Sequence, residues 1–138
     1  MLIEWTEAFN LGVERMDATH REFVVQLNAL AEAPDASLLS GLDSFIDHTV
    51  EHFGQEERWM QRTSFPPLHC HAEEHEGVLR IMREVRGFVQ SGRIDLGRIL
   101  VRELAPWFSN HAATMDAMLA HFLKENGIDP DTLPQQDA

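Results

Sequence analysis

The 138-residue sequence is short of cysteine, of basic residues and of long apolar runs, and each shortage excludes something. Cys70 is the only cysteine, so no internal disulfide can form and a reducing compartment is expected. Eleven lysines and arginines stand against 23 acidic residues, and the net charge of −12 disfavours nucleic acid and anionic membranes as partners. No apolar run approaches the ~20 residues of a membrane span. The N-terminal MLIEWTEAF lacks the basic and apolar regions of an export signal, so we expect a cytoplasmic protein.

The length and composition predict one soluble globular domain, since 43% of the residues are hydrophobic and 25% are charged. We expect this domain to span residues 1–129 and to begin with an extended arm over residues 1–16. A polar, flexible C-terminal tail is expected over residues 130–138. The acidic surface is compatible with a monomer, which we expect.

Four stretches carry apolar residues at the i, i+3, i+4, i+7 spacing of a helix with one buried face. The four sets are Phe23, Val24, Leu27, Leu30 and Ala31; Leu42, Phe45, Ile46, Phe53 and Met60; Leu68, Val78, Leu79, Met82 and Val89; and Leu100, Leu104, Trp107, Phe108, Met115, Met118 and Phe122. Short breaks at residues 33–35, 64–67 and 91–92 separate the stretches, and Gly127 ends the last. They predict an all-α, antiparallel up-down-up-down four-helix bundle. Pro106 predicts a kink or a restart in the fourth helix.

Five of the eight histidines lie on these apolar faces. They are His20 in the first stretch, His52 in the second, His71 and His75 in the third, and His111 in the fourth. Glu56 shares the face of His52. Because residues four apart stack on one side of a helix, His52 with Glu56, and His71 with His75, can each hold a common centre.

Each of these residues, taken alone, could have a purely structural role. A single core histidine is usually hydrogen-bonded without doing chemistry, and a single H-x-x-x-E pair is usually a weak surface ion pair. Five inward histidines and a carboxylate are different, because each unpartnered buried polar group costs ~1–3 kcal/mol. A metal ion satisfies such a set best. The remaining histidines, His48, His69 and His121, fall at the edges of the faces or near turns and predict surface or supporting positions. Cys70 is not expected to be a ligand, because His71 and His75 already supply that face.

The ligand set favours iron, and it leaves zinc and copper open. Zinc is satisfied by four ligands, and this core offers more. The Glu-x-x-His pairs of ferritin-like di-iron proteins are absent from the sequence, which lowers that possibility.

The combined motifs resemble the bacterial hemerythrins over about residues 5–122. The motifs are Trp5…Gly12-Val13-Glu14…Met16-Asp17-Ala18-Thr19-His20, His52-Phe53-x-x-Glu56-Glu57-x-x-Met60, Phe65-Pro66-x4-His71-x3-His75, and Trp107-Phe108-x-x-His111-x4-Asp116. The resemblance adds Asp116, which periodicity alone leaves outside, about 140° around an ideal helix from His111. Asp116 therefore has to reach inward with its side chain or through a local distortion of the helix.

The resemblance implies two non-haem iron ions. One would take His71, His75 and His111, the other His20 and His52, and both would share Glu56, Asp116 and a solvent-derived oxo or hydroxo bridge. The first iron then has six ligands and the second has five. The open position, on the His20/His52 iron, would bind O2.

The side chains expected beside that position are apolar. They are Phe23, Val24, Phe53 and Phe108. Two residues depart from the family pattern: Phe108 stands where hemerythrins usually carry leucine over the oxygen site, and Phe65 replaces the usual tyrosine before Pro66. Neither departure affects the predicted ligand set, but a larger residue at 108 bears on access to the pocket and on autoxidation.

The leading hypothesis is an oxygen-binding protein for delivery, storage or buffering, and not an enzyme. A second hypothesis is a sensor of O2 or redox state that acts through a partner. A third is a di-iron enzyme that scavenges peroxide or nitric oxide, which the apolar pocket disfavours because proton-coupled turnover needs an acid or a base. A fourth is a structural site for zinc or mixed metals.

Overall fold

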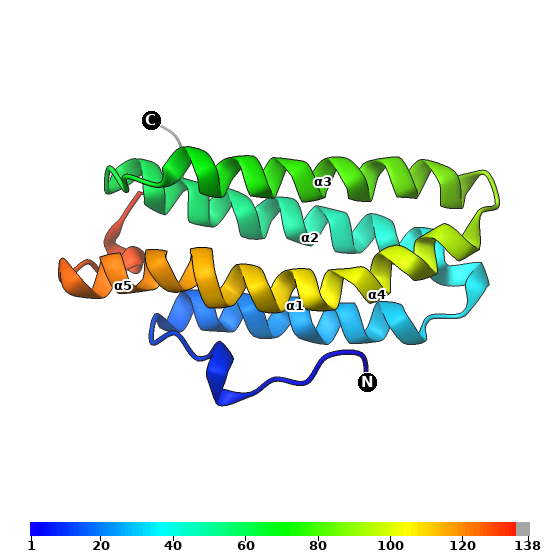
Figure 1. Ribbon diagram of the computed structural model, residues 1–138, viewed down its shortest axis with the longest axis horizontal. Helices are drawn as coiled ribbons and strands as arrows, with labels where there is room; N and C mark the ends of the chain where they lie inside the picture. Colours follow the sequence, from blue (N-terminus) through cyan, green and yellow to red (C-terminus); the bar gives the residue numbers. More distant parts are fainter. Residues whose placement is uncertain (135–138) are drawn as a thin grey trace.

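The computed structural model describes residues 1–134. The protein is a bundle of four antiparallel helical segments, called rods below (Figure 1). The first three are α1 (Glu14–Glu32), α2 (Asp35–Arg62) and α3 (Leu68–Gln90). The fourth is continuous but changes its winding, from α4 (Ile94–His111) through the π-helical segment η2 (Ala112–Asp116) to α5 (Ala117–Glu125). Short 3-10 turns, η1 (Glu7–Phe9) and η3 (Pro130–Thr132), flank the bundle. The predicted up-down-up-down four-helix bundle is confirmed.

The turns between the rods lie where the sequence breaks predicted them. Pro34 precedes the first residue of α2, and Pro67 precedes the first residue of α3. Gly92 and Gly127 have φ values of +102° and +63°, a region that glycine enters without the steric cost of a Cβ. These residues reverse the chain sharply after α3 and end α5.

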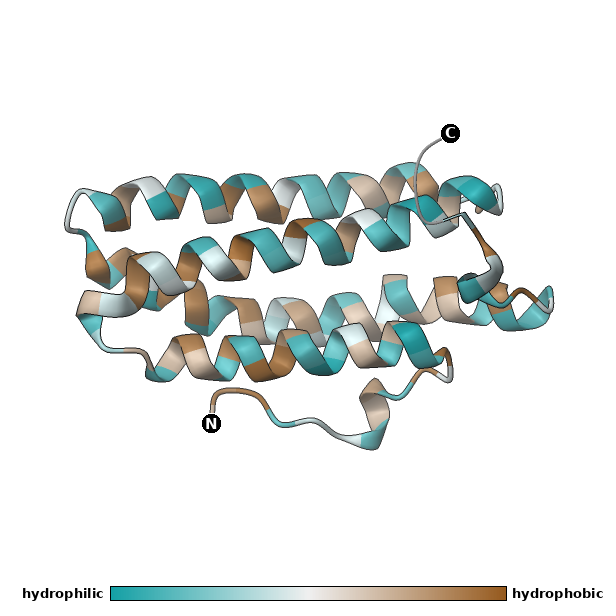
Figure 2. Cartoon of the chain, turned by 180° about the vertical axis from the view of Figure 1, so that it is seen from behind, coloured by the Kyte–Doolittle hydropathy of each residue, from teal (hydrophilic) through white to brown (hydrophobic). Residues whose placement is uncertain are grey.

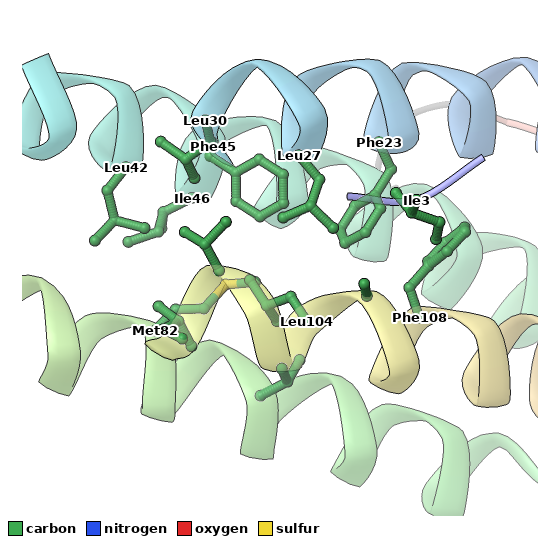
Figure 3. Close-up of a cluster of buried hydrophobic side chains, with 14 of the residues drawn as sticks. Ile3, Phe23, Leu27, Leu30, Leu42, Phe45, Ile46, Met82, Leu104 and Phe108 are labelled. Carbon is green, nitrogen blue, oxygen red and sulfur yellow. The ribbon is translucent and has the colours of Figure 1, made fainter. Parts of the chain in front are cut away.

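The apolar core is divided into two clusters. The larger one runs from Phe23 and Phe108 toward Leu42 and Met82 (Figure 3). The smaller one surrounds Trp59 at the other end of the bundle. It consists of Val13, Met16, Trp59, Met60, Phe65, Leu119, Ala120 and Leu123. Along each rod the chain passes from one cluster to the other through buried polar residues, so a polar layer lies between the clusters. The mixture of hydrophobic and hydrophilic residues on every rod is visible in Figure 2.

Residues 1–13 lie outside the four rods. The helix α1 begins at Glu14 and so includes residues 14–16, the last three of the predicted arm. The side-chain oxygen of Asn28 on α1 accepts hydrogen bonds from the backbone N–H groups of Leu2 and Ile3, both at 2.9 Å. At the start of α1 the buried Asp17 accepts hydrogen bonds from the N–H groups of Leu11 and Gly12. The segment thus runs along the bundle, and its own residue Phe9 is buried against the core.

Of the two alternatives predicted at Pro106, a restart of the helix is wrong, because α4 continues through the proline to His111, while a kink stays a prediction. Proline removes the hydrogen bond that the carbonyl of Arg102 would accept. Both Pro106 and Arg102 lie on the exposed side of α4, where water can replace the missing donor. The winding changes only at η2, which begins at Ala112, six residues after Pro106.

The π-helical segment η2 shifts the inward face of the fourth rod by one residue. The sequence predicted Met115, Met118 and Phe122 on that face, but the fully buried residues are Asp116, Leu119 and Leu123, while Met118 is 55% exposed. A π turn accommodates one residue more than an α turn. Every inward position after His111 therefore falls one residue later than a regular 3.6-residue period predicts.

The C-terminal residues from 130 onward were predicted as a flexible tail, and this stays a prediction. Residues 135–138 lie outside the described part of the chain. In residues 130–134, Pro130 is buried and Asp131 Oδ1 accepts a hydrogen bond from Arg15 Nε at 3.0 Å. Among the described helices, none has the length and apolar character needed to cross a membrane.

Candidate metal centre

The polar layer contains all seven residues predicted as metal ligands. His20 comes from α1, His52 and Glu56 from α2, His71 and His75 from α3, His111 from α4 and Asp116 from η2. Six of them are at most 1% exposed, and His52 is 6% exposed. Their ligand atoms form two groups that share Glu56. One consists of Glu56, His71, His75, His111 and Asp116, and the other of His20, His52 and Glu56, with all ligand atoms of a group within 4.8 Å of one another.

The two oxygens of Glu56 face opposite groups of histidines. Oε2 lies 2.9 Å from His52 Nε2 and 3.3 Å from His20 Nε2. Oε1 lies 3.2 Å from His75 Nε2 and 3.5 Å from His71 Nε2. The carboxylate thus spans the boundary between the groups.

Asp116 spans the same boundary from the opposite rod. Its Oδ2 lies 3.1 Å from His20 Nε2, while Oδ1 lies 3.1 Å from His71 Nε2 and 3.3 Å from His111 Nε2. The π turn that ends at Asp116 brings it beneath His111, although the two residues are five positions apart. The local distortion expected from the sequence is therefore present, and it lies between the two residues it has to align.

These separations suit atoms that share a metal ion. Metal–nitrogen and metal–oxygen bonds of about 2.1 Å set neighbouring ligands at right angles about 3 Å apart. Several of the same atoms have no hydrogen bond within the described residues: His71 Nε2, Glu56 Oε1 and both carboxylate oxygens of Asp116. They are close to charged neighbours but lack hydrogen-bond geometry. Because buried polar atoms are nearly always satisfied, this layer is suited to a metal site.

The two carboxylates strongly favour protons on the facing imidazoles when no metal is bound. Burial alone would lower the pKa of His20, but Asp116 and Glu56 outweigh it and raise that pKa to about 10. The same opposition raises the pKa of His71 to about 9. Burial alone would raise the pKa of Glu56, yet the facing imidazoles, His52 first, hold it well below its usual range. A metal ion bound here therefore competes with protons for these nitrogens.

Two further carboxylates support the histidines from outside the layer. Glu57 Oε2 lies 3.1 Å from His75 Nδ1, and Glu74 Oε1 lies 2.9 Å from His111 Nδ1. Helical spacing from the inward Glu56 predicts that Glu57 points toward water, which is wrong in part, because its side chain is only 34% exposed and contacts His75. Both residues directly follow or precede a predicted ligand, Glu56 and His75, and that adjacency is the signal that periodicity overlooked. Such outer carboxylates orient an imidazole and increase its basicity.

The four apolar residues predicted beside the open position are all buried. Phe23 and Phe108 stack with ring centroids 4.4 Å apart, and Phe108 meets His20 edge-on at 5.3 Å. Phe53 stacks on His75 at 3.8 Å and lies 5.2 Å from His52, so it contacts both groups. Val24 belongs to the same core cluster.

Phe9, from the segment before α1, was not among the predicted pocket residues. Its ring stacks on Phe108 with centroids 5.5 Å apart. No helical period extends into residues 1–13, so only the fold could bring this ring over the pocket. Outside the layer, His48, His69 and His121 are exposed, in line with the surface or supporting positions predicted for them, and Cys70 is exposed as well.

The bundle and its layer of imidazoles and carboxylates define a four-helix-bundle protein with a buried site suited to metal. The chain belongs to the family described as the hemerythrin HHE cation binding domain, which matches residues 11–127. It is 47% identical to a bacteriohemerythrin of Ralstonia nicotianae over 128 residues, 93% of each chain. It is 29% identical to a bacteriohemerythrin of Stenotrophomonas maltophilia, over 89% of this chain and 82% of that protein. It is also similar to a myohemerythrin of Sipunculus nudus, at 24% identity over 81% of this chain and 86% of that protein. The resemblance inferred from the motifs is confirmed.

Proposed function

We propose that this protein holds two non-haem iron ions and binds O2 reversibly at one of them. The observation that carries the proposal is that the two oxygens of each carboxylate face different groups of histidines. Glu56 and Asp116 each direct one oxygen toward His20. The other oxygen of Glu56 faces the histidines of α3, and that of Asp116 faces His71 of α3 and His111 of α4. Two bridging carboxylates between two groups of imidazoles are what a pair of ions requires, and a single four-coordinate zinc would leave ligands unused.

The ligand sets of the two proposed ions are unequal. His71, His75 and His111 serve one ion and His20 and His52 the other, while Glu56, Asp116 and a solvent-derived oxygen bridge serve both. The group of His20 and His52 offers one imidazole fewer, so an ion held there would have room for an outside ligand. Reduced iron, when bound, would supply the electrons for binding O2.

The surroundings of His20 support binding over turnover. Phe108 packs edge-on against His20 and stacks on Phe23, whose ring lies 6.0 Å from that of His52, and neither phenylalanine can donate a proton. A bound oxygen molecule would therefore find no acid on that side to protonate it and drive its reduction. The names bacteriohemerythrin and myohemerythrin of the similar proteins agree with this proposal. Roles in delivery, storage or buffering all use this same reversible step.

Metal analysis and an oxygen titration test the proposal. The protein should hold about two iron ions per chain, as the two groups of ligands predict. After anaerobic reduction, O2 should produce a visible charge-transfer band that disappears on deoxygenation. A band that decays promptly to the ferric state while oxygen is consumed would point to an enzyme instead. Zinc in place of iron, with no band, would contradict the proposal.

A further inference from the structure

His52 is the most accessible of the seven residues in the polar layer. Its exposed fraction is 6%, whereas that of each of the other six is 1% or less. The proposed open metal position belongs to the same half of the layer, the half of His20 and His52. The layer therefore approaches solvent on the side where an external ligand would bind.

A cleft between α1 and α2 leads from the surface to His52. It has a volume of about 640 Å³, and its wall includes Glu14, Glu22, His48, Glu51, Arg58 and His52. A second hollow of about 20 Å³ adjoins the cleft and is lined by Gln26 and by the buried residues Phe23 and Thr49 as well, so it is called the inner hollow. Thr19, Glu22, His48 and His52 line both spaces. The inner hollow has room for about one water molecule.

Toward Phe108, the apolar side of His20 is closed by aromatic rings. Phe108 lies between Phe23 and Phe9, with centroid distances of 4.4 Å and 5.5 Å. All three rings are at most 9% exposed. A polar molecule crossing this side would have to displace packed rings and give up its hydrogen bonds with water, which is costly.

We propose that the α1–α2 cleft is the passage by which water and small polar ligands reach the His20/His52 half of the centre. Gln26 and His48 control its width, since both border the narrow inner hollow. The inference rests on the proposed function in that the passage leads to the open metal position. It adds polar access on one side of a pocket whose other side is apolar.

The charge of the cleft selects among polar ligands. Glu14, Glu22, Glu51 and Asp131 contribute four negative charges to its wall, and Arg15 and Arg58 contribute two positive ones. Arg15 is paired with Asp131 at 3.0 Å. An anion moving inward is therefore repelled, and its association should accelerate as salt screens the wall. A neutral ligand should show no such dependence on salt.

Azide association with the iron-loaded ferric protein, followed by stopped-flow absorbance, tests the passage. Tryptophan in the inner hollow, as His48→Trp or Gln26→Trp, should slow both association and dissociation by about tenfold or more, because a gate changes both rates equally. The azide dissociation constant should stay within about twofold of the parent value. Ser40→Trp is the matched control, since exposed Ser40 lies on the same helix as His48 and lines a neighbouring hollow that includes Gln26 and His48 but not His52.

A second measurement does not depend on iron. Deuterium exchange at the imidazole C2 of His52, followed by mass spectrometry in the chain as purified, should slow in both variants, with exposed His69 and His121 as internal references. Unchanged azide rates in His48→Trp and Gln26→Trp would overturn the proposal. If the chain binds no iron, the proposed function fails, and unchanged exchange at His52 in both variants then overturns the passage by itself.

Discussion

Asp116 Oδ1 lies 3.3 Å from His111 Nε2, although five positions separate the two residues along one rod. On an α-helix they would point about 140° apart. The π turn over Ala112–Asp116 closes this angle and carries the shift onward, so that Leu119 and Leu123 are buried and Met118 is not. One local irregularity therefore positions a proposed ligand and sets the packing of α5.

Deleting Ala113, an exposed residue of this turn, should convert the π turn into an α turn. Asp116, Leu119 and Leu123 would keep facing inward, so we expect the free energy of unfolding to fall by less than about 2 kcal/mol. Deleting exposed Glu103 from the regular part of α4 is the control. It rotates everything that follows by about 100° and should unfold the protein. Chemical denaturation measures the free energy of unfolding of both variants. An equal loss from the two deletions would contradict this account of the turn.

Replacing His52 with alanine should remove one iron of the proposed pair. His52 belongs to the group with only two imidazoles, whereas the group of His71, His75 and His111 keeps all its ligands. We expect metal analysis to fall from about two to about one iron per chain, with loss of the oxygen-dependent band and an unchanged helical circular dichroism spectrum. His48 is exposed and lies one turn earlier, so His48→Ala should change neither the iron content nor the oxygen-dependent band. Oxygen binding that survives in His52→Ala would exclude His52 as a ligand.

Metal uptake should release protons at neutral pH. The pKa of His20 is raised to about 10 and that of His71 to about 9. At pH 7 in the metal-free protein both imidazoles are therefore positively charged, with a proton on each ring nitrogen. Metal binding needs their lone pairs and displaces those protons. Titrating ferrous iron anaerobically into weakly buffered protein should acidify the solution, and the apparent affinity should rise with pH up to about 9–10. An affinity independent of pH between 6 and 9 would contradict the assignment of these two ligands.

The same shifts set the sign of the stability change in the metal-free protein. A histidine whose pKa is raised on folding stabilises the fold fully below its unfolded pKa of about 6.5. That contribution is lost as the pH rises through the folded pKa of about 10 for His20. Glu56, with its lowered pKa, stabilises the fold above its unfolded pKa and loses this effect as the pH falls. The metal-free protein should therefore lose stability in thermal melts as the pH falls into strong acid, and also as the pH rises from about 6.5 to about 10.

Phe108→Leu should loosen the apolar side of the pocket. Phe108 is 1% exposed and stacks between Phe23 and Phe9, so the smaller side chain leaves a cavity. We expect a loss of about 1–2 kcal/mol in the free energy of unfolding and faster O2 association in stopped-flow measurements. Phe88→Leu removes the same atoms at a position that is 49% exposed and should change neither. An oxygen association rate unaffected by Phe108→Leu would show that this ring does not limit access.

The sequence alone determined the number of helices, their order and most of the inward-facing residues. The apolar period of 3.6 residues is a local property, and it positioned His20, His52, His71, His75 and His111 correctly on the buried faces. The breaks between the helices were equally local, because proline and glycine restrict or free the backbone where they stand. The resemblance to hemerythrins then contributed Asp116, which the period had left outside.

Only the tertiary structure decided what depends on contacts between rods. The π turn interrupts the helical period without a local breaker, so the exposed Met118 and the buried Leu119 could not be inferred from spacing. The contacts of Glu57 with His75, of Glu74 with His111 and of Phe9 with Phe108 join residues far apart along the chain. The cleft that reaches His52 is lined by side chains of both α1 and α2, so it exists only once these helices are packed together. Spacing along one helix determines which way a side chain points, but the packing of the four rods determines what it meets.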